Sequence, residues 1–303
     1  MIIRPRPHWL RMLFVVRGSV LPDILPQLAA ATLFAMLVTH LHGQVLQWKV
    51  PLNFVPFSLA GLTLAIFLGF RNSTSYARYW EARTHWGTLL NESRSLVRQA
   101  STLVDAPERV RELTMLLAAF VHALRHQLRG TAADDDLRRL LGADLAAGLA
   151  SVRYKPAMLL MMAGRWIGDR RREGALATVL VPAMEAPLGR LTEALGGCER
   201  IASTPIPFTY VLMIHRTIYV YCLLLPFGLV DAIGTMTPLI VAFIAYTFFA
   251  LEAIAQEIEE PFGIAPNDLA LDAMSAMIEA ALRESIGETL PEPPHDPDRI
   301  LLT

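Results

Sequence analysis

Four long apolar runs, arranged as two pairs around one long polar stretch, dominate the pattern of this 303-residue chain. The runs cover residues 24–48, 50–70, 205–230 and 232–251. Only the third contains an acid, lysine or arginine, which is Arg216, directly after His215. A helix needs about 20 mostly apolar residues to cross a bilayer, so each run is long enough. The pattern predicts four transmembrane helices.

The polar stretch between the two pairs, residues 71–204, carries a helical pattern of its own. Large apolar residues recur there three and four positions apart, at Leu113, Leu116, Leu117, Phe120, Val121 and Leu124. This spacing places them on one face of a helix, which Pro107 precedes and Gly130 follows. We find no convincing alternating pattern for a strand and no internal repeat. The sequence therefore predicts an all-α membrane protein whose long helices extend into a cytoplasmic helical domain.

These patterns divide the chain into six segments. They are a basic N-terminal segment (1–23), transmembrane helices one and two (24–70), a cytoplasmic helical region (71–204), transmembrane helices three and four (205–255), a cytoplasmic helical segment (256–289) and a Pro-rich tail (290–303). The prolines of the tail predict an extended or mobile segment.

Composition and charge agree with a membrane protein and exclude some other classes. Charged residues make up 18% of the chain and hydrophobic residues 53%, whereas soluble chains carry about 25% charged residues. The net charge of −1 gives no reason to expect a nucleic-acid partner. The two cysteines, Cys198 and Cys222, form no metal-binding or disulfide pattern.

The distribution of arginines predicts how the chain crosses the membrane. The N-terminal stretch "MIIRPRPHWLRMLFVVRGS" contains four arginines and no acid, and its apolar part is too short for a signal peptide. The short links between paired runs contain Lys49 as their only lysine or arginine, whereas residues 71–204 contain most of the arginines. Because basic residues favour the cytoplasmic side, we expect both termini and the polar middle to be cytoplasmic.

The stretch "IFLGFRNSTSYARYWEARTHWG", residues 66–87, changes from apolar to charged between Phe70 and Arg71 without a break in the helical pattern. No proline occurs between Pro56 and Pro107, and a proline near a helix start is well tolerated. A helix over most of that interval measures about 65–70 Å at 1.5 Å per residue. One helix is therefore expected to cross the membrane boundary at Arg71 and continue in the cytoplasm.

Leu62, Ile66 and Phe70 occur four residues apart on one face of this helix. One interpretation is an ordinary lipid-facing or helix-packing stripe, since the small residues Gly61 and Gly69 allow close helix approach. The other is a hydrophobic constriction, formed by several copies of the helix around a symmetry axis, which gates by dewetting.

Three separated stretches resemble the bestrophin family, and in particular its bacterial branch. They are "GFRNSTSYARYWEARTHWG", "CERIASTPIPFTYVLMIHR" and "EIEEPFGIAPNDLALD", and the resemblance extends over nearly the whole chain. It implies a homopentameric ion channel with one central pore in the bacterial inner membrane, with the lipid bilayer and monovalent ions as its other partners. No catalysis and no cofactor are expected.

The resemblance also implies which residues line the pore. The three apolar residues of the family's neck correspond to Leu62, Ile66 and Phe70, and the second, cytosolic constriction corresponds to Ile206 in "TPIPF". The flanking prolines Pro205 and Pro207 restrict the backbone, so the side chain of Ile206 can be held as a stiff ring.

The preferred ion is less strongly specified, because an apolar neck carries no charge. Vertebrate relatives are chloride channels, whereas the resemblance to bacterial members favours cations, and sodium among them; an anion channel is the alternative. Continuing the pore face beyond Phe70 gives Thr74, Ala77 and Glu81, and a ring of Glu81 carboxylates would favour cations. Glu81 has a second interpretation, in which it pairs with Arg78, Arg83 or a neighbouring helix.

Vertebrate members of the family continue the third stretch into an acidic calcium-binding run, and this chain departs from them there. It has Asp268 and Asp272 but no cluster of consecutive carboxylates, whereas calcium needs six to eight oxygen ligands. We therefore expect no calcium gating and no metal site, although Asn267 and Asp268 could hold an adventitious ion.

Two rival functions rest on weaker patterns. His122 and His126, four residues apart, have a spacing that can hold a metal in a membrane enzyme, but Arg125 and Arg129 would repel a cation, so a packed or solvated helix face is the alternative. No HExxH, glycine-rich phosphate loop or GxSxG motif is present. The other rival is a non-conducting membrane scaffold.

Overall fold

The structure is a computed structural model that describes residues 8–16, 18–45, 48–49 and 52–289. The predicted Pro-rich tail at 290–303 and the first seven residues of the basic segment lie outside the described residues. The chain divides into two compact units. Among the described residues, we call those within 8–79 and 205–260 the apolar unit, and those within 80–204 and 261–289 the polar unit.

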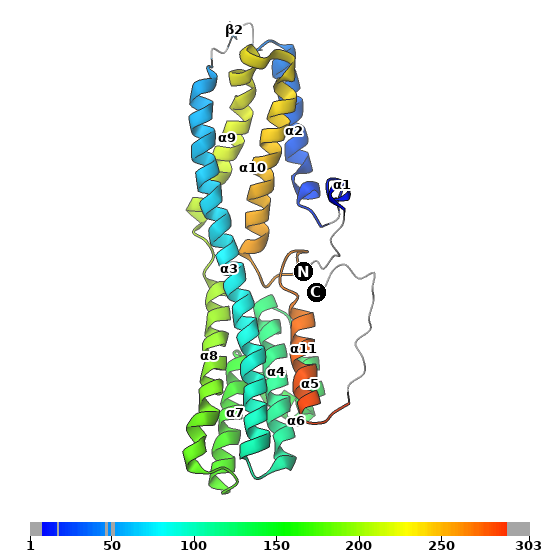
Figure 1. Ribbon diagram of the computed structural model, residues 1–303, viewed down its shortest axis with the longest axis vertical. Coiled ribbons are helices and arrows are strands. Elements are labelled where there is room, and N and C mark those ends of the chain that lie inside the picture. The colour runs from blue at the N-terminus through cyan, green and yellow to red at the C-terminus, as the bar shows by residue number, and fades with distance from the viewer. Residues whose placement is uncertain (1–7, 17, 46–47, 50–51, 290–303) are drawn as a thin grey trace. The chain divides into compact units, whose positions relative to one another are not determined.

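The apolar unit consists mainly of long helices (Figure 1). Its elements are α1 (Trp9–Met12), α2 (Leu21–His40), β1 (Gln44–Val45), β2 (Trp48–Lys49), the first half of α3 (Phe54–Leu103), α9 (Phe208–Ile233), the 3-10 turn η3 (Gly234–Met236) and α10 (Thr237–Glu259). By length and apolar composition, three helical stretches can cross a membrane: Leu21–His40, Phe54–Leu103 and Phe208–Glu259. The last of these contains both α9 and α10, which η3 separates.

The first apolar run does not form one helix. A short hairpin follows the helix, and at this hairpin the expectation of no strand was wrong. Helix α2 ends at His40, where His42 and Gly43 adopt positive φ angles of 50° and 72°. A left-handed backbone of this kind ends a helix. The chain then forms the antiparallel β1–β2 hairpin, in which Val45 pairs with Trp48. Two residues per strand are too few for an alternating pattern to be visible in the sequence.

Helix α3 is continuous over its 50 residues, as predicted from the absence of proline between Pro56 and Pro107, and Pro56 itself lies in its first turn, where a proline is tolerated. It begins at Phe54, where the side chain of Asn53 accepts a hydrogen bond from the N–H of Val55 at 3.1 Å. At 1.5 Å per residue its length is about 75 Å. A single helix therefore carries the chain through the change of polarity between Phe70 and Arg71.

The core of the apolar unit lies between α2, α3, α9 and α10. Its larger cluster contains Leu64 and Leu68 of α3, packed with residues of the other three helices such as Ile24, Ile218 and Phe249. Helix α9 also approaches α3 closely, since a Cβ at Gly61 would lie 2.7 Å from the hydroxyl of Tyr221. The close approach expected for Gly61 is confirmed, whereas a Cβ at Gly69 would meet nothing within 4 Å.

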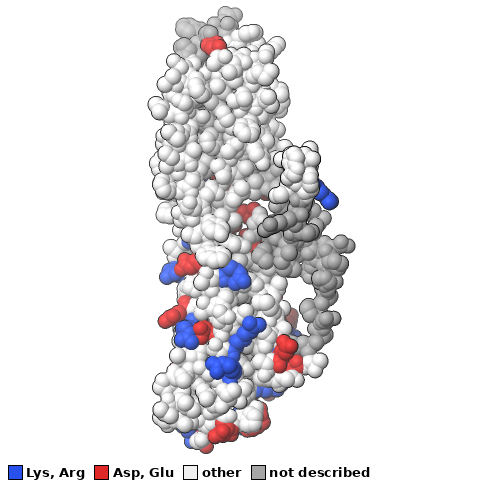
Figure 2. Space-filling model, in the orientation of Figure 1, with Lys and Arg blue, Asp and Glu red and all other residues white. Residues whose placement is uncertain are grey.

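The polar unit packs several helices around a buried central helix, α4 (Val110–Arg129). Its other elements are the second half of α3, η1 (Pro107–Arg109), α5 (Asp134–Leu141), α6 (Ala143–Leu149), α7 (Lys155–Arg172), η2 (Thr178–Leu180), α8 (Val181–Ser203) and α11 (Leu271–Ser285). The apolar stripe predicted from Leu113 to Leu124 is buried in α4, and Gly130 ends that helix with a φ of 64°. On the face shown in Figure 2, charged side chains of both signs lie over the polar unit and few lie over the apolar unit.

A network of charged residues joins α4, α5 and α11 inside the polar unit. Nε2 of His122 lies 2.8 Å from Oε2 of Glu279, and Arg139 donates to the same carboxylate at 2.6 Å. Asp136 accepts from Arg125 at 2.7 Å and lies 3.1 Å from Nε2 of His126. The two histidines that a metal site would use are each engaged with a carboxylate. They belong to a packed helix face.

The contact between α3 and α8 makes a prediction about two adjacent glycines. A Cβ at Gly197 would overlap the imidazole ring of His85, whereas a Cβ at Gly196 meets nothing within 4 Å. Overpacking costs about 1–3 kcal/mol, while Gly to Ala in a free helical position stabilises by about 0.5–1 kcal/mol. We therefore expect Gly197→Ala to lower the melting temperature of the detergent-purified protein and Gly196→Ala to leave it unchanged or raise it. Equal effects of the two variants would contradict this packing.

The charged network predicts a loss of stability in acid. Burial would raise the pKa of Asp136, but hydrogen bonds from Arg139 and His126 outweigh burial and lower this pKa to about 2. Burial is likewise outweighed at Glu279, whose pKa is lowered by hydrogen bonds from His122 and Arg139. Because both pKa values lie below those of the unfolded chain, about 4, the stabilisation is complete above the unfolded pKa and is lost as pH falls through the folded pKa.

We expect the melting temperature, followed by tryptophan fluorescence, to fall between about pH 5 and about pH 2. Glu279→Gln should be less stable than wild type at neutral pH and show a smaller fall in acid. Glu284→Gln, an exposed position on the same helix, is the matched control and should behave like wild type. An acid profile of Glu279→Gln that parallels wild type would show that the network does not carry the effect.

Candidate functional site

Helix α3 has one face in the core and one face that is uncovered in the single chain. Leu64 and Leu68 on the first face are 2% and 0% exposed, whereas Leu62, Ile66 and Phe70 on the second are 62%, 51% and 63% exposed. Large apolar side chains that remain this exposed indicate contact with lipid, with another copy of the chain or with a pore. The predicted neck residues therefore share one open face.

The positions predicted to continue this face differ among themselves. Thr74 and Ala77 are exposed, and the hydroxyl of Thr74 donates to the carbonyl of Phe70 at 3.0 Å, within the helix. Glu81 accepts a hydrogen bond from Arg200 of α8 and lies 3.6 Å from Nε2 of His85. Glu81 thus pairs with a neighbouring helix, which was the second interpretation of this residue. Its partner there is Arg200.

Ile206 lies in the short link between α8 and α9, with a proline on each side. Pro207 forms the N-cap of α9, and its φ of −53° is one that the proline ring favours. The backbone N–H of Ile206 donates to Oε1 of Glu259 at 3.2 Å. This hydrogen bond attaches the link to the end of α10, and the side chain of Ile206 remains half-buried.

A buried group of charges lies at the end of the apolar stretch of α3. Arg71 is 1% exposed, and its guanidinium lies 3.7 Å from the carboxylates of both Glu252 and Glu259. Nδ1 of His215 lies 2.7 Å from the carboxylate of Glu252. Glu252 therefore pairs with Arg71 and His215, whereas Arg216 is exposed.

Sequence reasoning missed Arg71 and Glu259 as parts of this site. The apolar-to-charged change marked Arg71 only as a membrane boundary, and Glu259 only as one acid in the "EIEEP" stretch. A single arginine directly after a long apolar run was the available signal, because a charge at such a position needs a buried partner. The sequence gives no distance between residues 71 and 259, so the pairing required the structure.

In the loop after α10 and at the start of α11, the acidic side chains are engaged with groups of the same chain. Oδ2 of Asp268 accepts from the N–H of Ala265 at 2.7 Å, and Asp272 pairs with Arg129 at 2.7 Å and with Arg125 at 3.2 Å. Within the part of the chain that the structure describes, no group of three or more His, Cys, Asp or Glu side chains is placed to hold a metal ion. The structure gives no support for an ion at Asn267 and Asp268.

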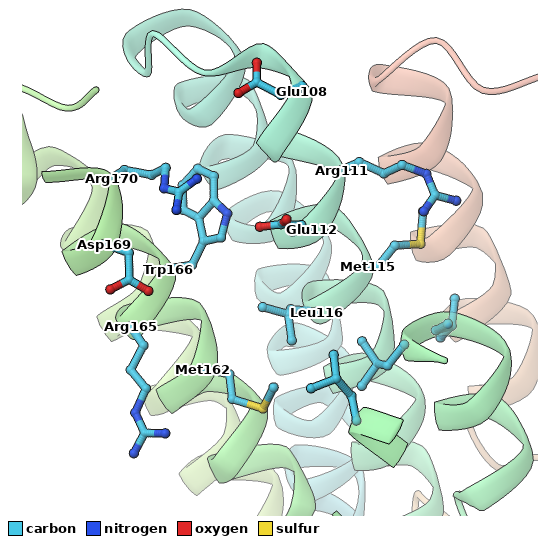
Figure 3. A pocket seen from close by; sticks show the side chains of 13 residues that line it. Glu108, Arg111, Glu112, Met115, Leu116, Met162, Arg165, Trp166, Asp169 and Arg170 are labelled. Atoms are coloured by element: carbon cyan, nitrogen blue, oxygen red, sulfur yellow. The ribbon is translucent and has the colours of Figure 1, made fainter. Parts of the chain in front are cut away.

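A cavity of about 540 Å³ opens in the polar unit between α4 and α7 (Figure 3). Its lining combines apolar residues such as Met115 and Met162 with charged ones such as Glu112 and Arg165, and the guanidinium of Arg170 lies 5.5 Å from the centre of the Trp166 ring. The lining residues include no serine, threonine, cysteine or histidine. The ionisable side chains of its lining are carboxylates and guanidinium groups.

Comparisons with known proteins agree on one family. The sequence profile described as "Bacterial/Fungal Bestrophin protein" matches residues 1–284. The chain is 52% identical over 291 residues to a "Voltage-dependent anion channel-forming protein" of Ralstonia nicotianae, with 95% of each chain covered. It is 44% identical over 283 residues to a protein of the same description from Escherichia coli K12, with 93% of each covered.

Solved structures show the same likeness. The crystal structure of a bacterial bestrophin homologue from Klebsiella pneumoniae superposes with a TM-score of 0.85 at 41% sequence identity. The match covers 88% of this chain and 100% of that one. These similarities agree with the long apolar helices and with the uncovered face of α3. The chain belongs to the bacterial/fungal bestrophin family of membrane proteins.

Proposed function

We propose that the chain forms an ion channel that passes monovalent ions passively through one central pore of a homopentamer. The observation that carries the proposal is the open face of α3, where Leu62, Ile66 and Phe70 are large, apolar and uncovered. Copies of this face around a symmetry axis would form a hydrophobic neck, which controls conduction by wetting and dewetting. The names of the relatives, which describe channel-forming proteins, support the same function.

The proposed channel resides in the bacterial inner membrane with both termini in the cytoplasm. Helix α2, the apolar half of α3, α9 and α10 would be its four transmembrane helices, and residues 71–204 and 256–289 its cytoplasmic part. The scarcity of basic residues in the links between paired helices supports this orientation. The lipid bilayer would cover apolar side chains that remain exposed on α10, such as Phe243.

Ile206 is proposed as a second constriction at the cytosolic end. Pro205 and Pro207 restrict the backbone conformation on both sides of Ile206. The hydrogen bond from the N–H of Ile206 to Glu259 attaches this part of the backbone to α10. A large apolar side chain on a restricted backbone can narrow a pore by its volume, without adding a charge that attracts or repels ions. The neck and Ile206 would then enclose a wider and wetter chamber.

For the sign of the ion we propose a preference for cations, with sodium as the favoured ion. Glu259 at the end of α10 contacts the backbone of Ile206, and the partial negative charge of the helix C-terminus adds to the charge of its carboxylate. Arg71 and Arg78 offset part of this charge. The competing proposal is an anion channel, which the names of the relatives favour.

The reversal potential in planar bilayers under a tenfold sodium chloride gradient separates these proposals. Ideal selectivity gives about 59 mV of one sign for a cation channel and of the opposite sign for an anion channel. We expect the current of wild type to reverse near the sodium equilibrium potential. We expect Ile206→Ala to carry a several-fold larger current, because its cytosolic constriction is wider. Reversal on the chloride side would overturn the ion and keep the pore. Silence of both correctly assembled proteins would favour the scaffold.

The neck makes a separate prediction. Ile66→Ser places a ring of hydroxyls in the proposed constriction and lowers the cost of wetting it, so we expect a several-fold larger current at an unchanged oligomeric state. Phe243→Ser, at an uncovered position of α10 that is 69% exposed against 51% for Ile66, is the control and should conduct like wild type. Single-channel recording measures both variants. An equal response to the two substitutions would exclude α3 as the specific lining of the pore.

A further inference from the structure

The last apolar residue of the proposed neck is followed directly by a buried charge. Phe70 is exposed on the open face of α3, while Arg71, the next residue, is 1% exposed and faces α10. Successive residues of a helix project about 100° apart, so the two side chains move together when the helix turns. Any rotation of α3 that moves Phe70 also moves the guanidinium of Arg71.

Helix α10 presents two carboxylates to this guanidinium. Nη1 of Arg71 lies 3.7 Å from Oε1 of Glu252, and Nη2 lies 3.7 Å from Oε2 of Glu259. The two glutamates are seven residues apart, which is about two helical turns, and both are buried. The positive charge of Arg71 therefore lies between two negative charges, in a region where water does not screen their attraction.

Glu259 continues the connection to the link that contains Ile206. One of its carboxylate oxygens, Oε2, faces Arg71, and the other, Oε1, accepts from the N–H of Ile206 at 3.2 Å. Pro205 and Pro207 have no N–H. The bond to Glu259 is thus made by the one backbone N–H that residues 205–207 possess.

We propose that Arg71 and Glu259 are a positioning pair that sets Ile206 in the aperture and couples the aperture to the neck. The inference rests on the proposed function, since it concerns how the two constrictions of that pore act together. A turn of α3 at Phe70 displaces Arg71, the displacement of Arg71 moves the carboxylate of Glu259, and that carboxylate carries the backbone of Ile206. The two constrictions then change width together.

A buried pair with only a structural role would also be costly to break, so the test has to measure coupling. Glu259→Leu removes both the partner of Arg71 and the acceptor of Ile206. Glu260→Leu, an exposed neighbour of the same charge, is the matched control. Ile206→Ala is introduced into each background, and the ratio of its current to that of the parent is recorded for proteins that elute as assembled oligomers.

We expect this ratio to be large in wild type and in Glu260→Leu and smaller by about twofold or more in Glu259→Leu, the size of interaction that contacting residues show. The reason is that without Glu259 the side chain of Ile206 no longer narrows the aperture reliably, so its removal adds little. The same ratio in all three backgrounds would overturn the proposal. If Glu259→Leu fails to assemble, Glu259→Gln tests the charge alone, because it keeps an acceptor oxygen for Ile206 and removes the charge that faces Arg71. We then expect a smaller ratio than in wild type, and an unchanged ratio would overturn the coupling through Arg71.

Amide hydrogen exchange tests the pair without relying on conduction. A peptide containing residues 205–207 reports the single N–H of Ile206 in that stretch, and we expect this N–H to exchange faster in Arg71→Met than in wild type or Glu260→Leu. Arg71→Lys, which keeps the charge, should restore part of the protection. Unchanged exchange in Arg71→Met would overturn the pair. Silence of wild type in bilayers with this exchange pattern intact would instead refute the channel function and leave the pair standing.

Discussion

A helix satisfies its own backbone hydrogen bonds, and the arrangement of this protein depends on that property in α3. Because no partner is needed for the backbone, one helix can pass from an apolar surrounding into a polar one without interruption. The sequence of α3 changes only its side chains at Phe70 and Arg71, while the helix continues to Leu103. Both compact units are consequently built on parts of the same helix.

The two faces of α3 have different requirements. Leu64 and Leu68 are fixed by packing against α9 and α10, so this side of the helix is specified by shape and volume. The side that carries Leu62, Ile66 and Phe70 is left more than half exposed by the described residues, so its large apolar side chains fill no core within the single chain. Buried charges at Arg71, Glu252 and Glu259 connect α3 to α10 at the level where the apolar sequence of α3 ends.

Sequence patterns predicted the elements that depend on local spacing and missed those that depend on long-range contact. The uninterrupted α3 followed from the absence of proline between Pro56 and Pro107, and the buried face of α4 followed from its helical periodicity. The β1–β2 hairpin was missed because its strands are too short to show a period. The neck, the aperture at Ile206 and the preference for cations remain predictions.

Contacts between distant charges explain most of what the sequence could not provide. Glu81 was considered for a ring of carboxylates, but its partner Arg200 lies 119 residues away along the chain. His122 and His126 suggested a metal by their spacing alone, while their carboxylate partners come from α5 and α11. Spacing along one helix describes which side chains share a face, and the chemistry of that face depends on what another helix brings to it.

The order of the segments along the chain has a consequence for biosynthesis. Helix α11, which supplies Glu279 to the network with His122 and Arg139, follows α10 in the sequence. On the ribosome, α4 and α5 therefore emerge long before the acid that pairs with His122 and Arg139. The polar unit can complete its charge pairing only after the last apolar helix has been translated, so insertion of the apolar helices and maturation of the polar unit are tied to one another in time.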